Sequence, residues 1–326
     1  MQPKSKKFPA GKVTKVRKVM IDEDQAGQRI DNFLRRQLPG VPRSRLYRIL
    51  RRGEVRVNKG RVRADHRLQA GDEVRIPPAW VREVPAAAPA GAMARIAAAI
   101  IYEDKHLLVI NKPSGVAVHG GSGIRHGVIE MLRELRPDLR DLSLAHRLDR
   151  DTSGCLVLAK RRSALRRLHE QFREGRVDKN YLALVVGDWQ LGDHRVDAPL
   201  LVRHRQGGER HVIVNEQGKS ARTRFRLSRT FGKYSLLQCQ PKTGRTHQIR
   251  VHALHLGYPL AGDERYGDPA ENGKVKKLGL KRLFLHAQSI AFPDGHGNEL
   301  HFTAPLAPGL EQFLDKLPGR LRGKSR

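Results

Sequence analysis

The chain has 326 residues and carries 63 Lys and Arg against 33 Asp and Glu, which gives a formal net charge of +30. This length suggests two domains with a core of ordinary size, and no apolar run approaches the roughly 20 residues that a membrane-spanning helix needs. The charge predicts a nucleic-acid partner rather than an anionic membrane, since Lys and Arg gain by displacing counterions from phosphates and no basic amphipathic helix carries the apolar face that membrane binding needs.

The N-terminal segment 1–20 carries seven basic residues and no acidic one. No apolar stretch follows it, so it lacks the pattern of a secretory signal, and we expect a flexible basic arm. The two cysteines, Cys155 and Cys239, both lie in apolar stretches. This is typical of reduced thiols in a cytoplasmic protein and argues against a disulfide or a metal site.

Residues 21–80 have the pattern of a small compact domain. The predicted elements are helices at 28–38 and from Ser44, and strands at 54–57 and 71–76. In the second helix, Arg45, Arg48 and Arg52 lie on a different face from the apolar residues. Such a face is often simply solvated, but eleven basic residues against one acid between positions 35 and 63 favour a bound polyanion.

This segment resembles the S4 RNA-binding domain. The resemblance is carried by Arg-Ile-Asp-Asn-Phe-Leu (29–34), Pro-Arg-Ser-Arg-Leu (42–46) and Gly-Glu-Val-Arg-Val-Asn (53–58). It implies that the second helix lies against an RNA backbone, with Arg45, Arg48 and Arg52 as the contacting side chains.

A linker and a larger second domain follow. Residues 81–99 are rich in Pro and Ala and lack periodicity, which predicts an interdomain linker. The second domain is predicted over 100–312, with a basic tail over 313–326. Its strands are predicted at 106–111, 155–160, 179–187, 221–229, 234–240, 283–291 and 299–304, and its helices at 126–136, 161–174 and 246–256. Strands in blocks with few helices between them indicate an α+β fold with a mixed, mainly antiparallel sheet.

The densest group of polar residues is His-Arg-Leu-Asp-Arg-Asp-Thr-Ser-Gly (146–154), directly before an apolar strand. This order puts a carboxylate near the core, with guanidinium groups beside it that favour its ionised form. A salt-bridged turn of ordinary turn-forming residues accounts for the same pattern. The Asp-x-Asp-x-Thr motif of aspartyl-phosphate phosphatases fits less well, because that motif follows a wholly apolar strand and has its Thr one residue further on.

A second polar group is Lys-Thr-Gly-Arg-Thr-His-Gln-Ile-Arg-Val-His (242–252). A strand turns at Gly244 and opens a helix at Thr246, and the backbone N–H groups there, with Arg245 beside them, favour an anion. The helix also carries His247, His252 and His255. No two of them lie four residues apart around a glutamate, as in zinc proteases, so no metal site is predicted.

Taken together, these stretches resemble the RluA-type pseudouridine synthases. The stretch 146–154 is similar to the family's signature, and further blocks follow the same order along the chain. These blocks are Asn-Lys-Pro-Ser-Gly (111–115) with His119, Lys-Asn-Tyr-Leu-Ala (179–183), Thr-Gly-Arg-Thr-His-Gln-Ile-Arg-Val-His (243–252) and Arg-Leu-Phe-Leu-His-Ala (282–287). The resemblance spans about 100–305 and implies isomerisation of uridine in RNA to its C5-glycoside. With an S4 domain in front, it implies large-subunit ribosomal RNA as the substrate.

The resemblance also implies roles for single residues. Asp149 would be the catalytic carboxylate, and Arg250 would pair with it and hold it ionised. Tyr181 would lie against the flipped base and is a candidate for taking up the C5 proton, directly or through water. Arg147 would fill the gap left in the base stack, and the remaining candidates for RNA contact or scaffold are Arg150, Lys112 and Arg245.

No cofactor, metal or nucleotide cofactor is expected, and the expected partner of a monomeric, cytoplasmic chain is ribosomal RNA rather than a membrane. Two other functions stay open from the residues alone. One is a non-catalytic RNA-binding factor on the same scaffold. The other is a hydrolase or phosphatase that uses Asp149 or Asp151.

Overall fold

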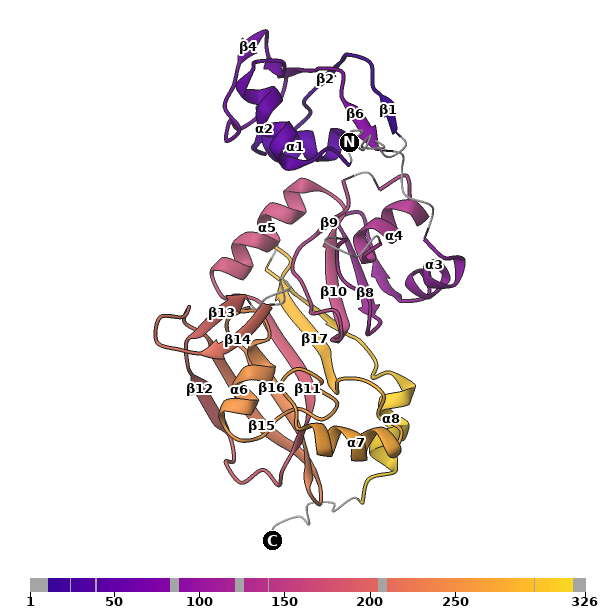
Figure 1. Ribbon diagram of the computed structural model, residues 1–326, viewed down its shortest axis with the longest axis vertical. Helices are drawn as coiled ribbons and strands as arrows, with labels where there is room; N and C mark the ends of the chain where they lie inside the picture. The colour runs from indigo at the N-terminus through magenta and orange to yellow at the C-terminus, as the bar shows by residue number, and fades with distance from the viewer. Residues whose placement is uncertain are drawn as a thin grey trace, which may run out of the picture. The chain divides into compact units, whose positions relative to one another are not determined.

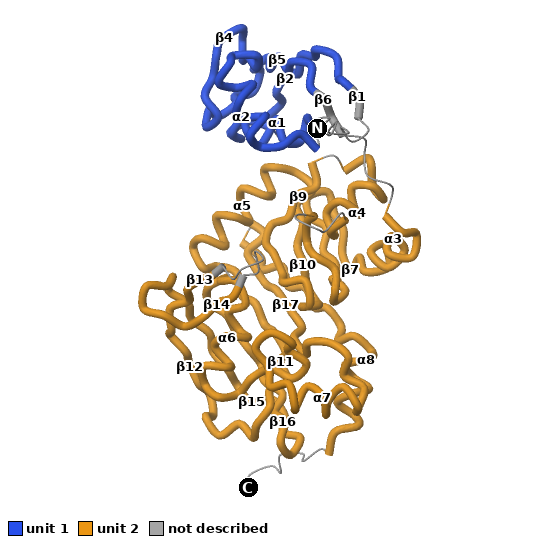
Figure 2. Tube along the Cα trace, in the orientation of Figure 1, with its two compact units in different colours: residues 1–87 blue, residues 88–326 orange. Residues whose placement is uncertain are grey.

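The computed structural model describes residues 11–23, 25–38, 40–82, 88–120, 126–139, 141–204, 210–295 and 297–318. The chain forms two compact units, residues 1–87 and 88–326 (Figure 2). Within the described ranges, no helix is long and apolar enough to cross a membrane.

The first unit packs two short helices and a small antiparallel sheet around one apolar core. The helices are α1 (Ile30–Gln37) and α2 (Arg43–Arg51), and the sheet has the order β2 (Arg17–Met20), β5 (Glu73–Ile76), β3 (Arg56–Val57) and β4 (Gly60–Arg61). Leu34, Leu46 and Val74 lie in its core. The predicted helices and strands of this segment are therefore confirmed.

The prediction of a flexible arm over 1–20 is wrong for its second half. Strand β2 pairs with β5, and β1 (Gly11–Val13) pairs with β6 (Trp80–Arg82). Val19 packs against the core of this unit, which gives the basic segment an apolar anchor. Residues 1–10 lie outside the described residues.

The second unit is built on a ten-stranded sheet (Figure 1). Its main path is β12 (His194–Asp197), β15 (Arg222–Phe231), β16 (Tyr234–Pro241), β11 (Asp178–Val186), β17 (Leu285–Pro293), β10 (Ser153–Ala159), β8 (Leu107–Lys112) and β7 (Ile100–Glu103). Strand β18 (Glu299–Thr303) pairs with β17, β9 (Ser143–Leu144) pairs with β10, and β13 (Leu200–His204) and β14 (Arg210–Val214) form a separate hairpin. The pairing of β10 with β17 is parallel and the other described pairs of this sheet are antiparallel, so the predicted mixed sheet is confirmed.

Helices cover both faces of this sheet. They are α3 (Ala90–Ala97), α4 (Val128–Leu135), α5 (Arg162–Arg173), α6 (Gln248–His255), α7 (Pro269–Lys277) and α8 (Pro308–Asp315). In β10, Leu156 packs with the cluster of α3 and α4, whereas the next residue, Val157, packs with that of α5. In β11, Leu184 packs with the cluster of α7 and α8, and Val185 with that of α6. Both strands are therefore buried on two sides, as their nearly continuous apolar sequences require.

Two predicted boundaries of this unit are wrong. The expected linker over 81–99 contains α3, because its alanines favour a helix and Ile96 is buried against the cluster of α4. The expected tail from 313 begins inside α8, where Phe313 and Leu317 are buried against the cluster of α7. Residues 319–326 lie outside the described residues.

Candidate active site

The signature stretch forms a loop between β9 and β10. The Thr152 N–H donates to the Asp149 carbonyl at 3.2 Å and closes its last turn. The next strand then starts directly beside β17: a Cβ atom on Gly154, whose φ is +112°, would lie 2.2 Å from the Ala287 carbonyl oxygen. Glycine is required here both for its backbone angle and for this close approach.

The loop opens onto a cavity of about 320 Å³ that collects the three predicted catalytic residues. Asp149 reaches it from the loop, Tyr181 from β11 and Arg250 from α6. A volume of this size is at the lower end of the range for small-ligand sites. Arg147 and Arg245 also line the cavity, and both are exposed.

Arg250 is bound to an acid that the sequence did not single out. Its Nε and Nη2 donate to the two carboxylate oxygens of Asp263 at 2.7 and 2.6 Å. Both side chains are buried, with 7% and 0% of their surface exposed. Arg250 thus pairs with Asp263 and not with Asp149 as predicted. Burial by itself lowers the pKa of the guanidinium, but the hydrogen bonds and charge of Asp263, followed by the charge of Asp149, raise it above its usual value.

Asp263 is held by the loop in which it lies. Its Oδ1 also accepts the backbone N–H groups of Arg265 and Tyr266, each at 3.0 Å. The guanidinium carbon of Arg250 lies 4.9 Å from the centre of the Tyr266 ring, and this cation–π contact stabilises the charge. The sequence did not point to Asp263, because it lies in Gly-Asp-Glu-Arg-Tyr-Gly (262–267), a turn-rich stretch without periodicity.

The same tyrosine connects to the start of α6. The Tyr266 hydroxyl accepts the Val212 N–H at 3.0 Å and lies within hydrogen-bond distance of His247 Nδ1, at 2.8 Å. Burial lowers the pKa of His247 to about 4, so the ring is neutral at pH 7. His247 takes the left-handed backbone conformation, with φ of 55°, which is unusual for a side chain with a Cβ and marks a constrained position at the cavity wall.

Tyr181 is a poor base in this environment. Burial and then the charge of Asp149 raise the pKa of its phenol above the ordinary value for tyrosine. The hydroxyl therefore keeps its proton at neutral pH and cannot accept a second one from carbon. This favours a packing role for the ring and a proton route through water.

Lys179 also lines the cavity, and sequence reasoning assigned it no role. Burial and the charge of Lys242 lower the pKa of its ammonium to about 8. Its Nζ donates to the Thr243 carbonyl at 3.3 Å, which joins β11 to the loop before α6. It is a cation inside the cavity that begins to lose its charge just above neutral pH.

Lys112 is not an RNA contact, because its side chain is completely buried. Its Nζ donates to three backbone carbonyls, those of Pro113 at 2.9 Å, Val116 at 2.7 Å and Arg150 at 2.9 Å. Burial lowers its pKa to about 7, while three acceptors match the three N–H groups of an ammonium. The lysine therefore clamps the loop after β8 to the residue that follows Asp149.

A second clamp holds the other end of the signature loop. Arg282 Nη2 donates to Ser153 Oγ at 2.8 Å, and Ser153 Oγ lies 2.9 Å from His286 Nδ1. His286 Nε2 lies 3.1 Å from the Ala304 carbonyl, so Nε2 carries the proton and Nδ1 accepts that of the serine. Burial lowers the pKa of His286, which keeps this direction of donation at neutral pH.

The other predicted RNA contacts lie on surfaces. Arg48 and Arg52 of the first unit are exposed and Arg45 is partly buried. Arg245 donates from Nε to the Ser220 carbonyl at 3.0 Å, and Arg150 is paired with Asp151 at 3.2 Å at the edge of the signature loop.

Comparison with known proteins agrees with this geometry. The family model for RNA pseudouridylate synthases matches residues 106–255, and the S4 domain model matches residues 28–74. The chain is 54% identical over 308 residues to the ribosomal large subunit pseudouridine synthase C of Escherichia coli (strain K12), covering 93% of this chain and 97% of that protein. The chain belongs to the RNA pseudouridylate synthase family. The protein of the same name from Pasteurella multocida (strain Pm70) is 53% identical over 306 residues, covering 93% of this chain and 94% of that one.

Solved structures of this family share the fold of the second unit. Human RNA pseudouridylate synthase domain containing 4 aligns with a TM-score of 0.59 at 28% identity, over 72% of this chain and 98% of that one. Human RNA pseudouridylate synthase domain containing 1 aligns with a TM-score of 0.57 at 27% identity, over 70% of this chain and 90% of that one. The chain is accordingly a pseudouridine synthase with an S4 domain in front.

Proposed function

We propose that this chain converts specific uridines of large-subunit ribosomal RNA to pseudouridine, with Asp149 as the catalytic carboxylate. The observation that carries the proposal is the meeting of Asp149, Tyr181 and Arg250 in one cavity. The substrate follows from the relatives, whose printed names are ribosomal large subunit pseudouridine synthase C. An S4 domain and a net charge of +30 support a large RNA as the partner.

The reaction moves one glycosidic bond and needs no net redox change. The N1–C1′ bond breaks with its electron pair on the uracil, the base turns over while it is held, C5 bonds to C1′, and C5 then loses its proton while N1 gains one. Hydrolysis of an ordinary glycoside by a retaining enzyme uses two carboxyl groups. Uracil leaves as an anion that its carbonyls delocalise, so one carboxylate suffices. Asp149 serves this role whether it attacks C1′ or removes the proton from C2′.

The surrounding residues fit the remaining steps. A stacked uridine is out of reach, so it must be flipped into the cavity, which costs a few kcal/mol and least in loops. Arg147, exposed at the cavity edge, would take its place in the stack. Tyr181 would pack on the base, and the C5 proton would pass to water, because the raised pKa of this phenol keeps it protonated.

The proposed enzyme acts as a monomer in the cytoplasm. Every side chain named above for the reaction lines one cavity of a single chain, so a second copy is not needed to complete the site. A non-catalytic RNA-binding factor remains the alternative that the experiment must separate, because the basic surfaces serve it equally well.

Release of tritium from C5-labelled uridine in a transcript of the large-subunit RNA tests the proposal, because only formation of the C5 glycoside frees that label. We expect release by the full chain, none by Asp149→Asn, and nearly equal RNA affinity for both. Asp151→Asn is the matched control: this acid pairs with Arg150 at the loop surface, and the variant should stay active. Full activity of Asp149→Asn would refute the assignment, and an inactive wild-type chain that binds the RNA would establish the non-catalytic alternative.

A further inference from the structure

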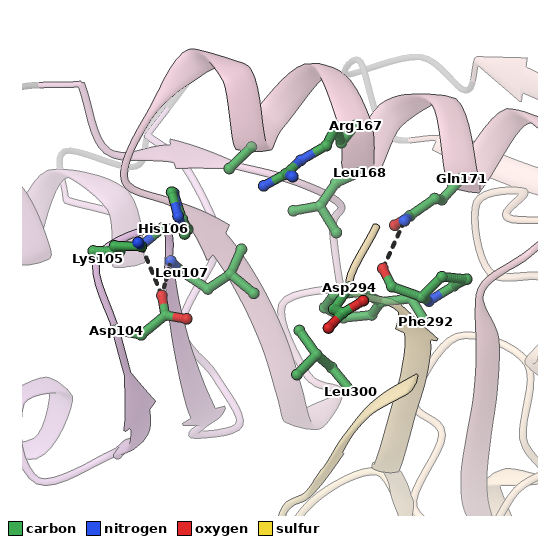
Figure 3. Close-up of a pocket in the computed structure, with 12 residues that line it drawn as sticks. Asp104, Lys105, His106, Leu107, Arg167, Leu168, Gln171, Phe292, Asp294 and Leu300 are labelled. Carbon is green, nitrogen blue, oxygen red and sulfur yellow. Dashed lines mark hydrogen bonds between the residues drawn. The ribbon is translucent and has the colours of Figure 1, made fainter. Parts of the chain in front are cut away.

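A second cavity of about 300 Å³ lies in the same unit, apart from the proposed active site. It is bounded by α5, by the turn between β7 and β8, and by the hairpin between β17 and β18 (Figure 3). Leu168 and Gln171 of α5 line this cavity, whereas the next residue, Phe172, lines the active-site cavity. The two cavities therefore flank the same turn of one helix, within about the 10–12 Å diameter of a helix.

Two side chains of this cavity carry buried polar atoms without a hydrogen-bond partner among the described residues. They are Gln171, whose Oε1 is unpaired, and His106, whose Nδ1 is unpaired. Gln171 is only 6% exposed, and its Nε2 donates to the Pro293 carbonyl at 2.7 Å, which fixes the amide over the cavity (Figure 3). A buried acceptor without a partner is unfavourable, so a ligand that supplies an N–H donor to it would be stabilised.

The two carboxylates of the cavity already have partners. Asp104 accepts the N–H groups of His106 and Leu107 at 2.7 and 2.6 Å and the hydroxyl of Tyr102 at 3.0 Å. Asp294 accepts the backbone N–H and the side-chain amide of Asn298 at 3.1 and 3.0 Å. Both acids therefore stabilise the turns in which they lie. Lys105 and Arg167 are the lysine and arginine of the lining that can contact an anionic ligand.

The rest of the lining is apolar and the surroundings are basic. Leu107, Leu168 and Leu300 supply a floor on which a flat ring can lie. The segment 161–176, which contains α5, carries six arginines and two glutamates, and Arg166 and Arg167 are both exposed. An apolar floor, an amide acceptor and a cationic rim together match a base, its N–H groups and its phosphate.

We propose that this cavity binds a second nucleotide of the RNA strand whose target uridine enters the active site. The base lies on the leucine floor and donates an N–H to Gln171 Oε1, and Arg167 contacts the phosphate. Holding a neighbouring nucleotide on the far flank of α5 would fix the strand while the target base turns over. The inference depends on the proposed function only for the source of the nucleotide.

Nucleotide binding can be followed on the histidine rings of the full chain, labelled with nitrogen-15, by NMR. The probes are the four ribonucleoside monophosphates added one at a time, with inorganic phosphate as a separate arm. We expect saturable movement of the His106 signal, which a His106→Gln variant identifies, with at least one nucleotide. The His247 signal reports binding in the active-site cavity independently.

Arg167→Gln and Arg166→Gln form a matched pair on one helix, because both arginines are exposed and only Arg167 lines the cavity. Losing one contact to a charged phosphate should weaken binding about tenfold in Arg167→Gln, and Arg166→Gln should bind like the parent. No movement of His106 with any nucleotide would overturn the proposal. So would equal effects of the two variants, or equal movement with phosphate alone, which would mark an anion site. Tritium release by the same preparations tests the proposed function separately.

Discussion

The buried fork between Arg250 and Asp263 should be the main support of the cationic wall of the proposed active-site cavity. Asp263→Asn keeps the shape of the side chain but removes its charge and turns an N–H donor toward the guanidinium, which is only 7% exposed. Removing one partner of a buried pair costs about 3–5 kcal/mol. For a unit of this size, 3 kcal/mol corresponds to a fall of about 6–12 °C in Tm. The kcat for tritium release should fall as well, because the guanidinium loses the two bonds that orient it.

A double-mutant cycle with Arg250→Met measures the coupling directly, by urea unfolding of the four chains. Replacing both partners should cost less than the sum of the single changes, with a coupling of about 2–3 kcal/mol. Asp193→Asn is the matched control, because Asp193 forks with Arg224 at the surface and is 40% exposed, so it should cost less than 1 kcal/mol, as is typical (~0–1) of exposed pairs. Equal costs at Asp193 and Asp263, or additive single changes, would refute the view that this pair holds Arg250.

Three further perturbations test the frame around the site. Because the pKa of Lys179 is lowered to about 8, its charge is present below that pH, and kcat/KM should fall as the pH rises through it; Lys179→Met should show no such step. Gly154→Ala should lower the free energy of unfolding in urea by about 3–5 kcal/mol, since its Cβ would lie 2.2 Å from the Ala287 carbonyl oxygen. Gly115→Ala is the control: its φ is +84° and no atom lies within 4 Å of the added Cβ, so it should cost about 1–2 kcal/mol. Lys112→Met leaves three carbonyls without a donor, so the free energy of unfolding should fall by about 3 kcal/mol. The same variant should have a lower kcat but an unchanged RNA affinity in a filter-binding assay.

Much of the fold could be predicted because its strands are short apolar runs and its main helices have an apolar stripe. Strand β10 and helix α5 are examples, and both lie within a few residues of their predicted bounds. Helix α7 escaped prediction because its sequence is polar and, of its residues, Val275 is the one that is buried. Helix α3 escaped prediction because its sequence shows no apolar periodicity, although alanine itself favours a helix.

The sequence predicted three residues that meet in the candidate site, but not the contacts that hold them there. The motif blocks indicated Asp149, Tyr181 and Arg250, yet periodicity cannot predict which carboxylate pairs with an arginine on a buried helix. Asp263 lies in an irregular loop, and its pairing follows from how that loop packs on α6. For Lys112 the sequence left an RNA contact and a scaffold role open, because lysines are rarely buried. Its acceptors include a carbonyl 38 residues away, which only the tertiary fold brings near.

The order of strands explains why the separate blocks of the sequence meet at one loop. Strand β8 is antiparallel to β10, so the end of β8 lies beside the start of β10. Strand β17 is parallel to β10 on its other side, so its start lies at the same edge. Lys112 at the end of β8 therefore bonds the signature loop from one flank, and Arg282 just before β17 bonds it from the other. An antiparallel β17 would carry Arg282 to the opposite edge, so the parallel pair at the centre of the sheet is what places two cationic clamps around the proposed carboxylate.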